Sequence, residues 1–415
     1  MDHEVPRPRF SRHELVLLAI LFSAIFVVGT GIQMGNALFP ALSRPLGVPV
    51  STVTLLVSVW AFTGLLAPLF GPPSDRYGHG MFVLIGLASF AIGNLLCAFA
   101  AGFAALLVFQ VFVGLGYAIF NFSASAVVGD VFAYGVRARA LGIVRVAVSV
   151  AALAGVPAAS AIAGWATARA SFGAVGGLCL IVLLLAWAFL PRSPQQEGPA
   201  PPVEARSNLW RSVMGVVRQR SAMAGLLTLA VWAMIPTGVF VYLAAWMEPT
   251  FRLTEAQVGL AFALVGVGGL IGNALTAAWT DRLGKKRSAL LGLVTLSAAA
   301  MLLPRLGAMP AVLCCIVLLA TALEFSTASF GTLMTELAPS SRGTFLSLTG
   351  LAIGIGTGVS PLLLRPLWES GGYGLVTLTL GVVGLVLALV IGILISEPQV
   401  SAPDQAGHAG GPAGA

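Results

Sequence analysis

The stretch Gly71-Pro-Pro-Ser-Asp-Arg-Tyr-Gly-His-Gly-Met81 is a short charged segment between two long apolar runs. A second version, Thr280-Asp-Arg-Leu-Gly-Lys-Lys-Arg287, places Asp281 206 positions after Asp75 (281 minus 75). Both copies read Asp-Arg-x-Gly at a break between hydrophobic segments. The pattern predicts one structural unit written twice, with the two hinges at equivalent places.

The composition around these hinges is that of a membrane protein. The chain has 415 residues, of which 58% are hydrophobic and 9% charged, and its mean hydropathy is +0.96. Soluble domains carry about 25% charged residues. A helix needs about 20 apolar residues to cross the hydrocarbon core, and twelve such runs can be marked between Leu15 and Ile395. The predicted fold is an all-α membrane protein with twelve transmembrane helices in two parallel six-helix pseudo-repeats, because runs this long exclude a β-barrel.

A stretch rich in Pro, Gln, Glu and Ala follows the sixth apolar run and has no apolar periodicity, which is typical of a linker. The predicted organisation is an N-terminal six-helix bundle at 1–190, a cytoplasmic linker at 191–220, a C-terminal six-helix bundle at 221–397 and a disordered tail at 398–415. In two parallel halves, the substrate pathway is expected at their interface near the bilayer midplane.

Basic residues are distributed unequally between the two predicted sides. Of 22 Lys and Arg residues, sixteen fall on segments predicted to be inner, five on outer segments, and Arg145 lies inside a helix. The net charge of +7 therefore follows from the excess of positive charge on cytoplasmic loops and indicates no nucleic-acid partner. Both termini are predicted to be cytoplasmic, in a bacterial inner membrane.

Enzymatic and ATP-driven functions find no support in the sequence. The four histidines are terminal or in a loop, and no Gly-rich phosphate loop ending in Lys-Ser/Thr is present. The spacing of His and Cys matches no metal site, and the four cysteines lie in apolar runs. We expect no enzyme, cofactor or metal, but a monomer whose partners are a small-molecule substrate, protons and membrane lipid.

The hinges resemble the signature of the major facilitator superfamily, Gly-x-x-x-Asp-Arg-x-Gly-Arg/Lys-Arg/Lys, and the resemblance extends over nearly the whole chain. The first copy departs from the signature at His79 and Gly80, and the second has Ala277 at the first Gly. In that family the hinge Asp and basic residues near helix four, here Arg137 or Arg139, form a latch that closes the cytoplasmic side. Plain hairpin capping with positive-inside charge is the alternative. The predicted gating residues are Gly71, Asp75, Arg76, Gly78, Asp130, Arg137, Arg139, Asp281, Arg282, Gly284, Glu336 and Arg342.

Two further motifs of the family concern the direction of transport and its coupling to protons. The fifth run contains Gly155-Val-Pro-Ala-Ala159, which resembles the exporter-associated Gly-Pro motif in degenerate form, although Gly and Pro also serve close packing and bending. In the fourth run, Gln110 stands where the family's proton-coupling Arg precedes Gly114. That departure puts the family's usual coupling arrangement in doubt.

Glu324 is the predicted proton-coupling residue. It lies about midway along the tenth run, and an ionisable group at that depth is a functional candidate by default. A buried carboxyl can load and release a proton as access alternates. A neutral Glu in a structural hydrogen bond is the alternative. Arg145, one or two turns inside the fifth run, is expected to pair with Asp130 or to extend to the inner interface.

The first helix of each helical triplet lines the cavity in the family, which selects helices one, four, seven and ten. The predicted substrate-binding residues on them are Gln33, Asn36, Tyr117, Asn121, Trp232, Tyr242 and Phe325, each of which is more typical of packing than of ligand contact. An aromatic cavity with a single acid favours a lipophilic, neutral or cationic solute over an anion.

The sequence thus predicts a secondary active transporter that exports a small lipophilic or cationic compound, such as a drug or metabolite, in exchange for protons by alternating access. An uptake symporter or a sugar or lysolipid exporter of the same fold is the alternative. A non-transporting membrane receptor is a third possibility.

Overall fold

The computed structural model describes residues 10–190, 214–215, 218–337 and 342–394, and all regular structure within these ranges is helical. The predicted tail at 398–415 and most of the predicted linker lie outside the described residues. The elements of the first half are α1 (Arg12–Leu46), α2 (Val50–Val53), α3 (Leu55–Gly64), η1 (Ala67–Phe70), α4 (Gly71–Tyr77), α5 (His79–Ala98), α6 (Phe103–Val131), α7 (Tyr134–Val150), η2 (Ala151–Gly155), α8 (Val156–Trp165) and α9 (Ala168–Phe189).

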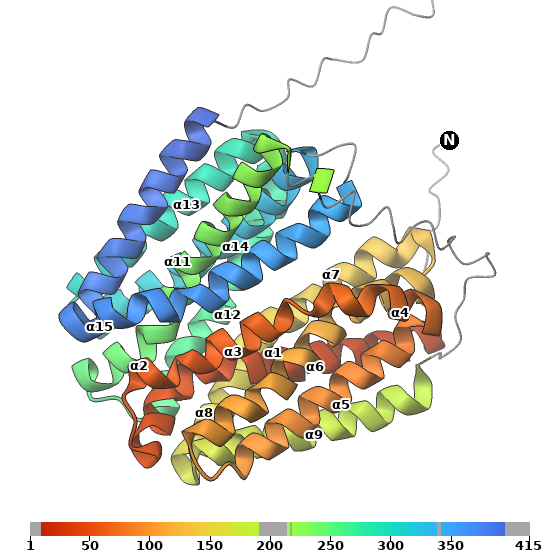
Figure 1. Ribbon diagram of the computed structural model, residues 1–415, viewed down its shortest axis with the longest axis horizontal. Coiled ribbons are helices and arrows are strands. Elements are labelled where there is room, and N and C mark those ends of the chain that lie inside the picture. The colour runs from red at the N-terminus through yellow and green to blue at the C-terminus, as the bar shows by residue number, and fades with distance from the viewer. Residues whose placement is uncertain (1–9, 191–213, 216–217, 338–341, 395–415) are drawn as a thin grey trace, which may run out of the picture.

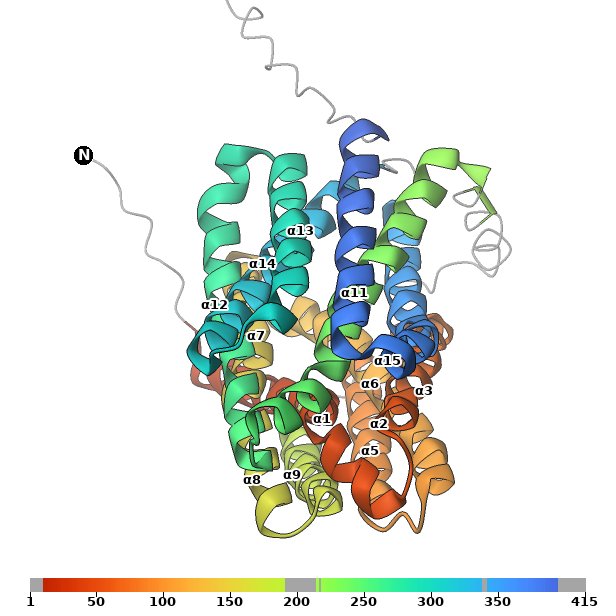
Figure 2. The ribbon, with the colours of Figure 1, turned by 90° about the vertical axis from the view of Figure 1, so that its left-hand side faces the viewer.

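The second half contains fewer and longer elements. They are α11 (Arg220–Phe251), α12 (Glu255–Leu283), α13 (Lys285–Leu302), η3 (Leu303–Arg305), α14 (Met309–Leu337) and α15 (Arg342–Leu394). Gly372 interrupts α15 with φ 62° and ψ −159°, so that α15 consists of two helical arms (Figure 2).

Within the described residues, eleven helical segments are long and apolar enough to cross a membrane. The last of them, 348–393, contains the break at Gly372. Each of its arms has about the 20 residues that a crossing requires. The eleven segments therefore cover the positions of all twelve predicted helices.

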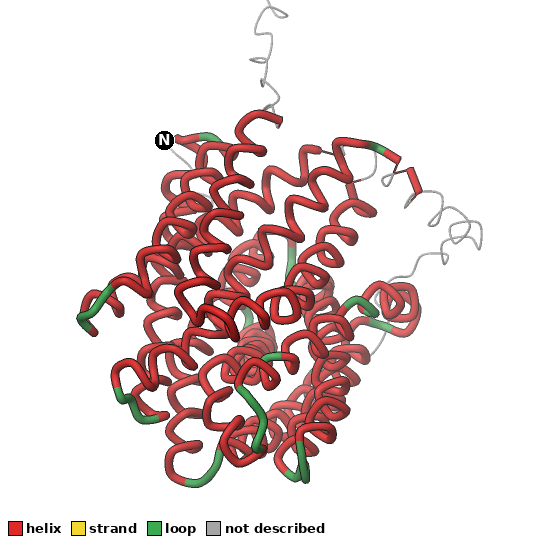
Figure 3. Tube along the Cα trace, turned by 60° about the vertical axis from the view of Figure 1, so that its left-hand side comes forward, coloured by secondary structure: helices red, strands yellow, loops and turns green. Residues whose placement is uncertain are grey.

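The helices form two bundles that lie side by side (Figures 1 and 3). In the first, α5 packs between α6 and α9, and in the second α14 packs against α12 and α13 while α11 packs against α15. Contacts between the bundles are made by α1 with α11, by α3 with α15, and by α7 and α8 with α12. We call the membrane side that carries α4 the hinge side, and the side that carries the end of α1 and the start of α12 the far side.

The fifth membrane segment passes from α7 through the π-helical turn η2 into α8. Gly155 closes this turn where it meets α1, and a Cβ placed there would lie 1.9 Å from Thr30 Oγ1. Only glycine therefore permits this approach of the two helices. Membrane helices associate through close packing at small residues, because no hydrophobic driving force acts between helices in lipid.

Candidate functional site

The hinge side of the first half is organised by His79. Its Nδ1 lies 2.7 Å from Asp130 Oδ2, and its Nε2 lies 3.1 Å from Asp75 Oδ1. A neutral imidazole has only one N–H, so the protonated ring is the form that can donate to both carboxylates. His79 thereby connects the hinge to the hinge-side end of α6, and it stands at a position where the family signature has Arg or Lys.

The two arginines expected to hold Asp75 have other partners in this structure. Arg137 donates from Nη2 to the Gly129 carbonyl and from Nε to the Phe132 carbonyl, the latter at 3.4 Å, so it caps the end of α6. The Arg139 guanidinium lies over the Phe10 ring at 5.6 Å. Asp75 pairs instead with His79, because the turn at Gly78 brings the imidazole at the start of α5 back to the carboxylate at the end of α4.

The remaining predicted gating residues are described in part. Gly71 begins α4, and exposed Arg76 lies over the Tyr77 ring at 5.4 Å. Gly78 and Gly284 each adopt positive φ between two helices, at 94° and 86°. Arg282 is exposed. Asp281, Glu336 and Arg342 lie in helices, and their side chains fall outside the described part of the chain.

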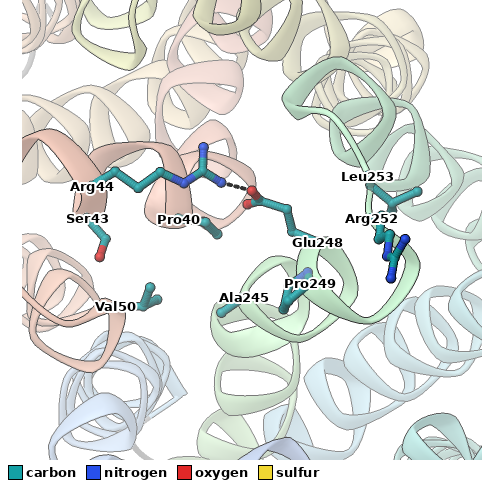
Figure 4. Close-up of a pocket in the computed structure, with 9 residues that line it drawn as sticks. All are labelled: Pro40, Ser43, Arg44, Val50, Ala245, Glu248, Pro249, Arg252 and Leu253. Carbon is teal, nitrogen blue, oxygen red and sulfur yellow. Dashed lines mark ion pairs between the residues drawn. The ribbon is translucent and has the colours of Figure 1, made fainter.

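An ionic cluster joins the two halves at the far side (Figure 4). Arg44, in the last turn of α1, contacts Glu248 of α11 and lies 2.8 Å from Glu255 at the start of α12. Arg44 and Glu248 line a cavity of about 530 Å³ together with Arg252 and apolar neighbours. The pairing holds α1 against the second half at this end.

A second set of polar contacts supports the same closure. Ser51 Oγ donates to Glu369 Oε1 at 2.9 Å, and Arg365 holds the same carboxylate at 2.9 Å. Tyr242, one of the predicted substrate residues, is fully buried here: its ring stacks on Trp368 at 4.8 Å and its hydroxyl lies 3.5 Å from Thr54 Oγ1. Tyr242 is therefore placed in the far-side closure.

Glycines allow α12 to pack closely against the fifth segment between the far side and mid-depth. A Cβ at Gly259 would lie 2.4 Å from Ser160 Cβ, and one at Gly266 would lie 2.6 Å from the Leu153 nitrogen. The hinge-side contacts of His79, by contrast, stay within the first half. The halves are thus closed at the far side, and their ribbons diverge toward the hinge side (Figure 1).

At mid-depth, polar groups from both halves converge on Gly269 of α12. A Cβ at Gly269 would lie 3.2 Å from Ser149 Oγ of α7 and 3.7 Å from Glu324 Cγ of α14. Asn273, one turn along α12, donates to the Gly269 carbonyl at 2.9 Å and interacts with the Glu324 carboxyl. Glu324 is half-buried at this point.

Arg145 is the charged residue of the first half that acts on Glu324. It lies one turn from Ser149 on α7, on the same helix face, and its side chain is exposed. Asp130 is held by His79, and the described ion pairs do not include Arg145 with Asp130. The alternative, that Arg145 extends to the inner interface, stays a prediction. Glycine at 269 lets α7 approach α12 at Ser149, one turn from Arg145.

The other predicted substrate residues are distributed over both halves. Gln33 donates to the Val148 carbonyl at 3.2 Å, beside the mid-depth group, and Phe325 is buried next to Glu324. Asn36 is half-buried in α1 and Asn121 is exposed in α6. The aromatic pairs are those of Tyr117 with Trp60, at 5.6 Å between centroids, and of Trp232 with Phe330, at 5.9 Å.

Several residues of these sites were not selected from the sequence. Arg44 was counted only among the five outer basic residues and Glu248 was not considered, while Asn273 and Ser149 are ordinary polar residues of membrane helices. Arg145 carried a usable signal, since a charge inside an apolar run is costly. Its electrostatic interaction with Glu324 could not be found from the sequence because the two residues are 179 positions apart (324 minus 145) in different halves.

Comparison with known proteins agrees with this architecture. The sequence profile of the Major Facilitator Superfamily matches residues 21–254 and 237–415. The chain is similar to the uncharacterized MFS-type transporter YceJ of Bacillus subtilis (strain 168), with 26% identity over 360 residues, 85% of this chain and 89% of the relative. It is also similar to the chloramphenicol resistance protein of Streptomyces lividans, with 27% identity over 381 residues, 86% of this chain and 92% of the relative.

Among solved structures, the crystal structure of the peptide transporter POT in complex with sulfate has a TM-score of 0.74 at 16% identity, covering 93% of this chain and 95% of that chain. This likeness concerns the fold. Together with the profile match across both halves, it identifies the protein as an integral membrane transporter: the chain belongs to the major facilitator superfamily.

Proposed function

We propose that the protein exports a small lipophilic or cationic compound in exchange for protons, with Glu324 as the proton-coupling residue. The observation that carries the proposal is the position of Glu324 at the interface of the halves, beside Gly269 at the point where Ser149 of the first half approaches it. A group at that interface changes its surroundings whenever the halves rock, which is the requirement for a coupling site.

The chemistry of coupling follows from the cost of a bare charge in the membrane, about 2.5–3.5 kcal/mol for an acidic residue at a helix centre. A protonated Glu324 avoids this cost. A deprotonated Glu324 is compensated by Arg145 or by a solute with a cationic or donor group. Proton and solute therefore exchange at one carboxyl.

The cycle starts from the far-side-closed arrangement. Glu324 releases its proton to water on the hinge side, the solute binds from the same side, and the halves reorient. After the solute leaves at the far side, the carboxyl takes a proton from water there and the protein returns. The gating proposal assigns the hinge side to the cytoplasm because the basic residues gather on it.

The far-side closure is weak enough to open in each cycle. The Arg44 side chain is 54% exposed, while Glu248 and Glu255 are 16% and 28% exposed. Pairs this accessible contribute about 0–1 kcal/mol each. Opening of the far side therefore breaks several ion pairs that each contribute little free energy, and none that contributes much.

The relative from Streptomyces lividans is a chloramphenicol resistance protein, and resistance by a membrane transporter supports export. The close packing of Gly155 on Thr30 puts the first residue of the degenerate Gly-Pro motif at the contact of η2 with α1. We infer that this contact serves the same outward cycle.

Proton flux in proteoliposomes tests the proposal. A pH-sensitive dye trapped inside reports proton movement when a candidate substrate is added, and Glu324→Gln should abolish substrate-driven proton movement while solute exchange across the membrane persists. Glu14→Gln, which removes a carboxylate from the first turn of α1, serves as the matched control. Unchanged coupling in Glu324→Gln would remove Glu324 from the mechanism, and substrate accumulation with the proton gradient reversed would identify an uptake symporter.

A further inference from the structure

The far-side cavity lies between the two halves and contains no residue of the mid-depth group around Gly269. Its volume is about 530 Å³, within the range that holds a drug-sized molecule. One wall belongs to the end of α1 and the start of α2, and the other to the last turns of α11 and the residues that follow it. Figure 4 shows Arg44 and Glu248 reaching toward each other across the space between these walls. A molecule in this cavity therefore contacts both halves and an ion pair at once.

Two carboxylates of the second half share the single guanidinium of Arg44. Its Nη2 contacts Glu248 Oε1 of α11, and its Nη1 lies 2.8 Å from Glu255 Oε1 at the start of α12. One positive and two negative charges leave this group with an excess negative charge. Because both acids stand on the same half, they stay neighbours when the halves part, and they then lose their common cation. The repulsion between them favours the entry of another cation.

Arg252 is the remaining charged residue of the wall. It follows the end of α11, is exposed, and has no carboxylate partner within the described ranges. Figure 4 shows its side chain set apart from the pair of Arg44 and Glu248. An exposed charge is screened by water and salt. Arg252 therefore lowers the affinity of the cavity for a cation without supplying the counterion of Glu248.

The rest of the lining is largely apolar. Pro40 and Leu253 are among the apolar residues, and the Ser43 hydroxyl is already engaged, because it donates to the Val48 carbonyl at 2.6 Å. A small hydrated ion leaves these apolar surfaces uncovered, whereas a cation with an apolar body removes them from water. The lining thus selects a lipophilic cation over an inorganic one, and the excess carboxylate selects it over an anion.

We propose that the far-side cavity is a second solute site, which binds a lipophilic organic monocation arriving from the far side. The cation takes the place of Arg44 beside Glu248, while Arg44 stays with Glu255. Arg44 and the ligand therefore compete for one carboxylate. The site uses neither Glu324 nor a proton, and it does not rest on the export function proposed above.

Protection of a cysteine in the cavity wall tests the proposal. Val50 lines the cavity, and Val50→Cys is introduced into the full chain with Cys314→Ala, because Cys314 is the exposed native cysteine. Labelling by a polar maleimide in detergent at pH 7 is followed at increasing concentrations of tetraphenylphosphonium. Tetraphenylborate, which has the same shape and the opposite charge, is the control probe. Tetraphenylphosphonium should slow the labelling severalfold, and tetraphenylborate at the same concentrations should not.

Substitutions at the ion pair locate the bound cation. Glu248→Gln should raise the half-protecting concentration about tenfold, the value of one charge pair near a protein surface, while Glu248→Asp should retain protection. Arg44→Gln removes the competitor and should lower that concentration. Glu369→Gln removes a far-side carboxylate outside the cavity lining and should leave the concentration unchanged.

Equal protection by the two probes, or unchanged protection in Glu248→Gln together with no gain in Arg44→Gln, would overturn the proposal. Protection that is lost in Glu324→Gln but kept in Glu248→Gln would place the cation in the mid-depth group and would overturn it too. Glu324→Gln should instead be protected like the parent protein. Proton flux is measured separately in Glu324→Gln, so this proposal and the proposed function can each fail alone.

Discussion

Gly78 and Gly284, 206 positions apart in the chain (284 minus 78), adopt nearly the same backbone conformation, with φ 94° and ψ 133° at the first and φ 86° and ψ 148° at the second. Each residue ends one helix and begins the next. This conformation is accessible almost only to glycine. The repeated Asp-Arg-x-Gly pattern thus corresponds to two hinges of equal geometry.

Replacing either hinge glycine should destabilise the protein. Gly78→Ala and Gly284→Ala should each lower the free energy of unfolding by about 1–3 kcal/mol, because a Cβ strains the backbone at this φ. Thermal unfolding in detergent measures the change. Gly177→Ala is the control. Gly177 is helical and a Cβ there meets nothing within 4 Å, so the stability of this variant should be unchanged or slightly higher. Equal stability of all three variants would show that the hinge conformation is not constrained.

The bridge from His79 to Asp75 and Asp130 should control the rate of the cycle. His79→Ala and Asp75→Asn should each lower turnover about two- to fivefold, as expected for exposed pairs of about 0–1 kcal/mol, with substrate affinity nearly unchanged. Initial rates and binding in the same preparation separate the two effects. A large loss of affinity in Asp75→Asn would contradict a gating role.

Arg44 should control access from the far side. Arg44→Gln removes the contacts with Glu248 and Glu255 and should increase labelling of Ala245→Cys by an impermeant maleimide up to about fivefold. The experiment uses a Cys314→Ala background, because Cys314 is the exposed native cysteine. Arg252→Gln, a change in the wall of the same cavity, is the control. Identical labelling of the two variants would show that the Arg44 pairs do not hold this side closed.

The contact of Gly155 with Thr30 should be sensitive to a single methyl group. Gly155→Ala should cost about 1–3 kcal/mol, since the added Cβ would overlap Thr30 Oγ1. Thr30→Ala should restore part of that loss in the double variant, which a double-mutant cycle of melting measurements quantifies. Additive effects of the two substitutions would mean that the residues do not contact each other in the membrane.

Local and repeated features of this protein were predictable from its sequence. The apolar runs predicted which segments are membrane helices, because a helix in lipid satisfies its own backbone hydrogen bonds and depends little on its neighbours. Glu324 was also identifiable, since an isolated charge in an apolar run is costly. The membership in a transporter family was indicated by the hinges at Gly71–Met81 and Thr280–Arg287.

The partners of the charged residues were not predictable in the same way. Asp75 pairs with His79, which departs from the family pattern, and Ser149 of the first half lies beside Gly269 together with Glu324. Tyr242 lies in the far-side closure although its helix was expected to line the cavity. These assignments depend on which faces of the helices meet, and an all-apolar helix carries little signal of its orientation.

The sequence by itself determined that the chain crosses the membrane repeatedly in two related halves. The length and hydropathy of each apolar run and the repeated hinge pattern are properties of local segments, which can be recognised without knowing their neighbours. Only the tertiary structure decided which side is closed, that His79 joins Asp75 to Asp130, and that Ser149 and Glu324 lie together beside Gly269. Such contacts join residues far apart in the chain. Their geometry is set by helix packing at small residues, which no single segment encodes.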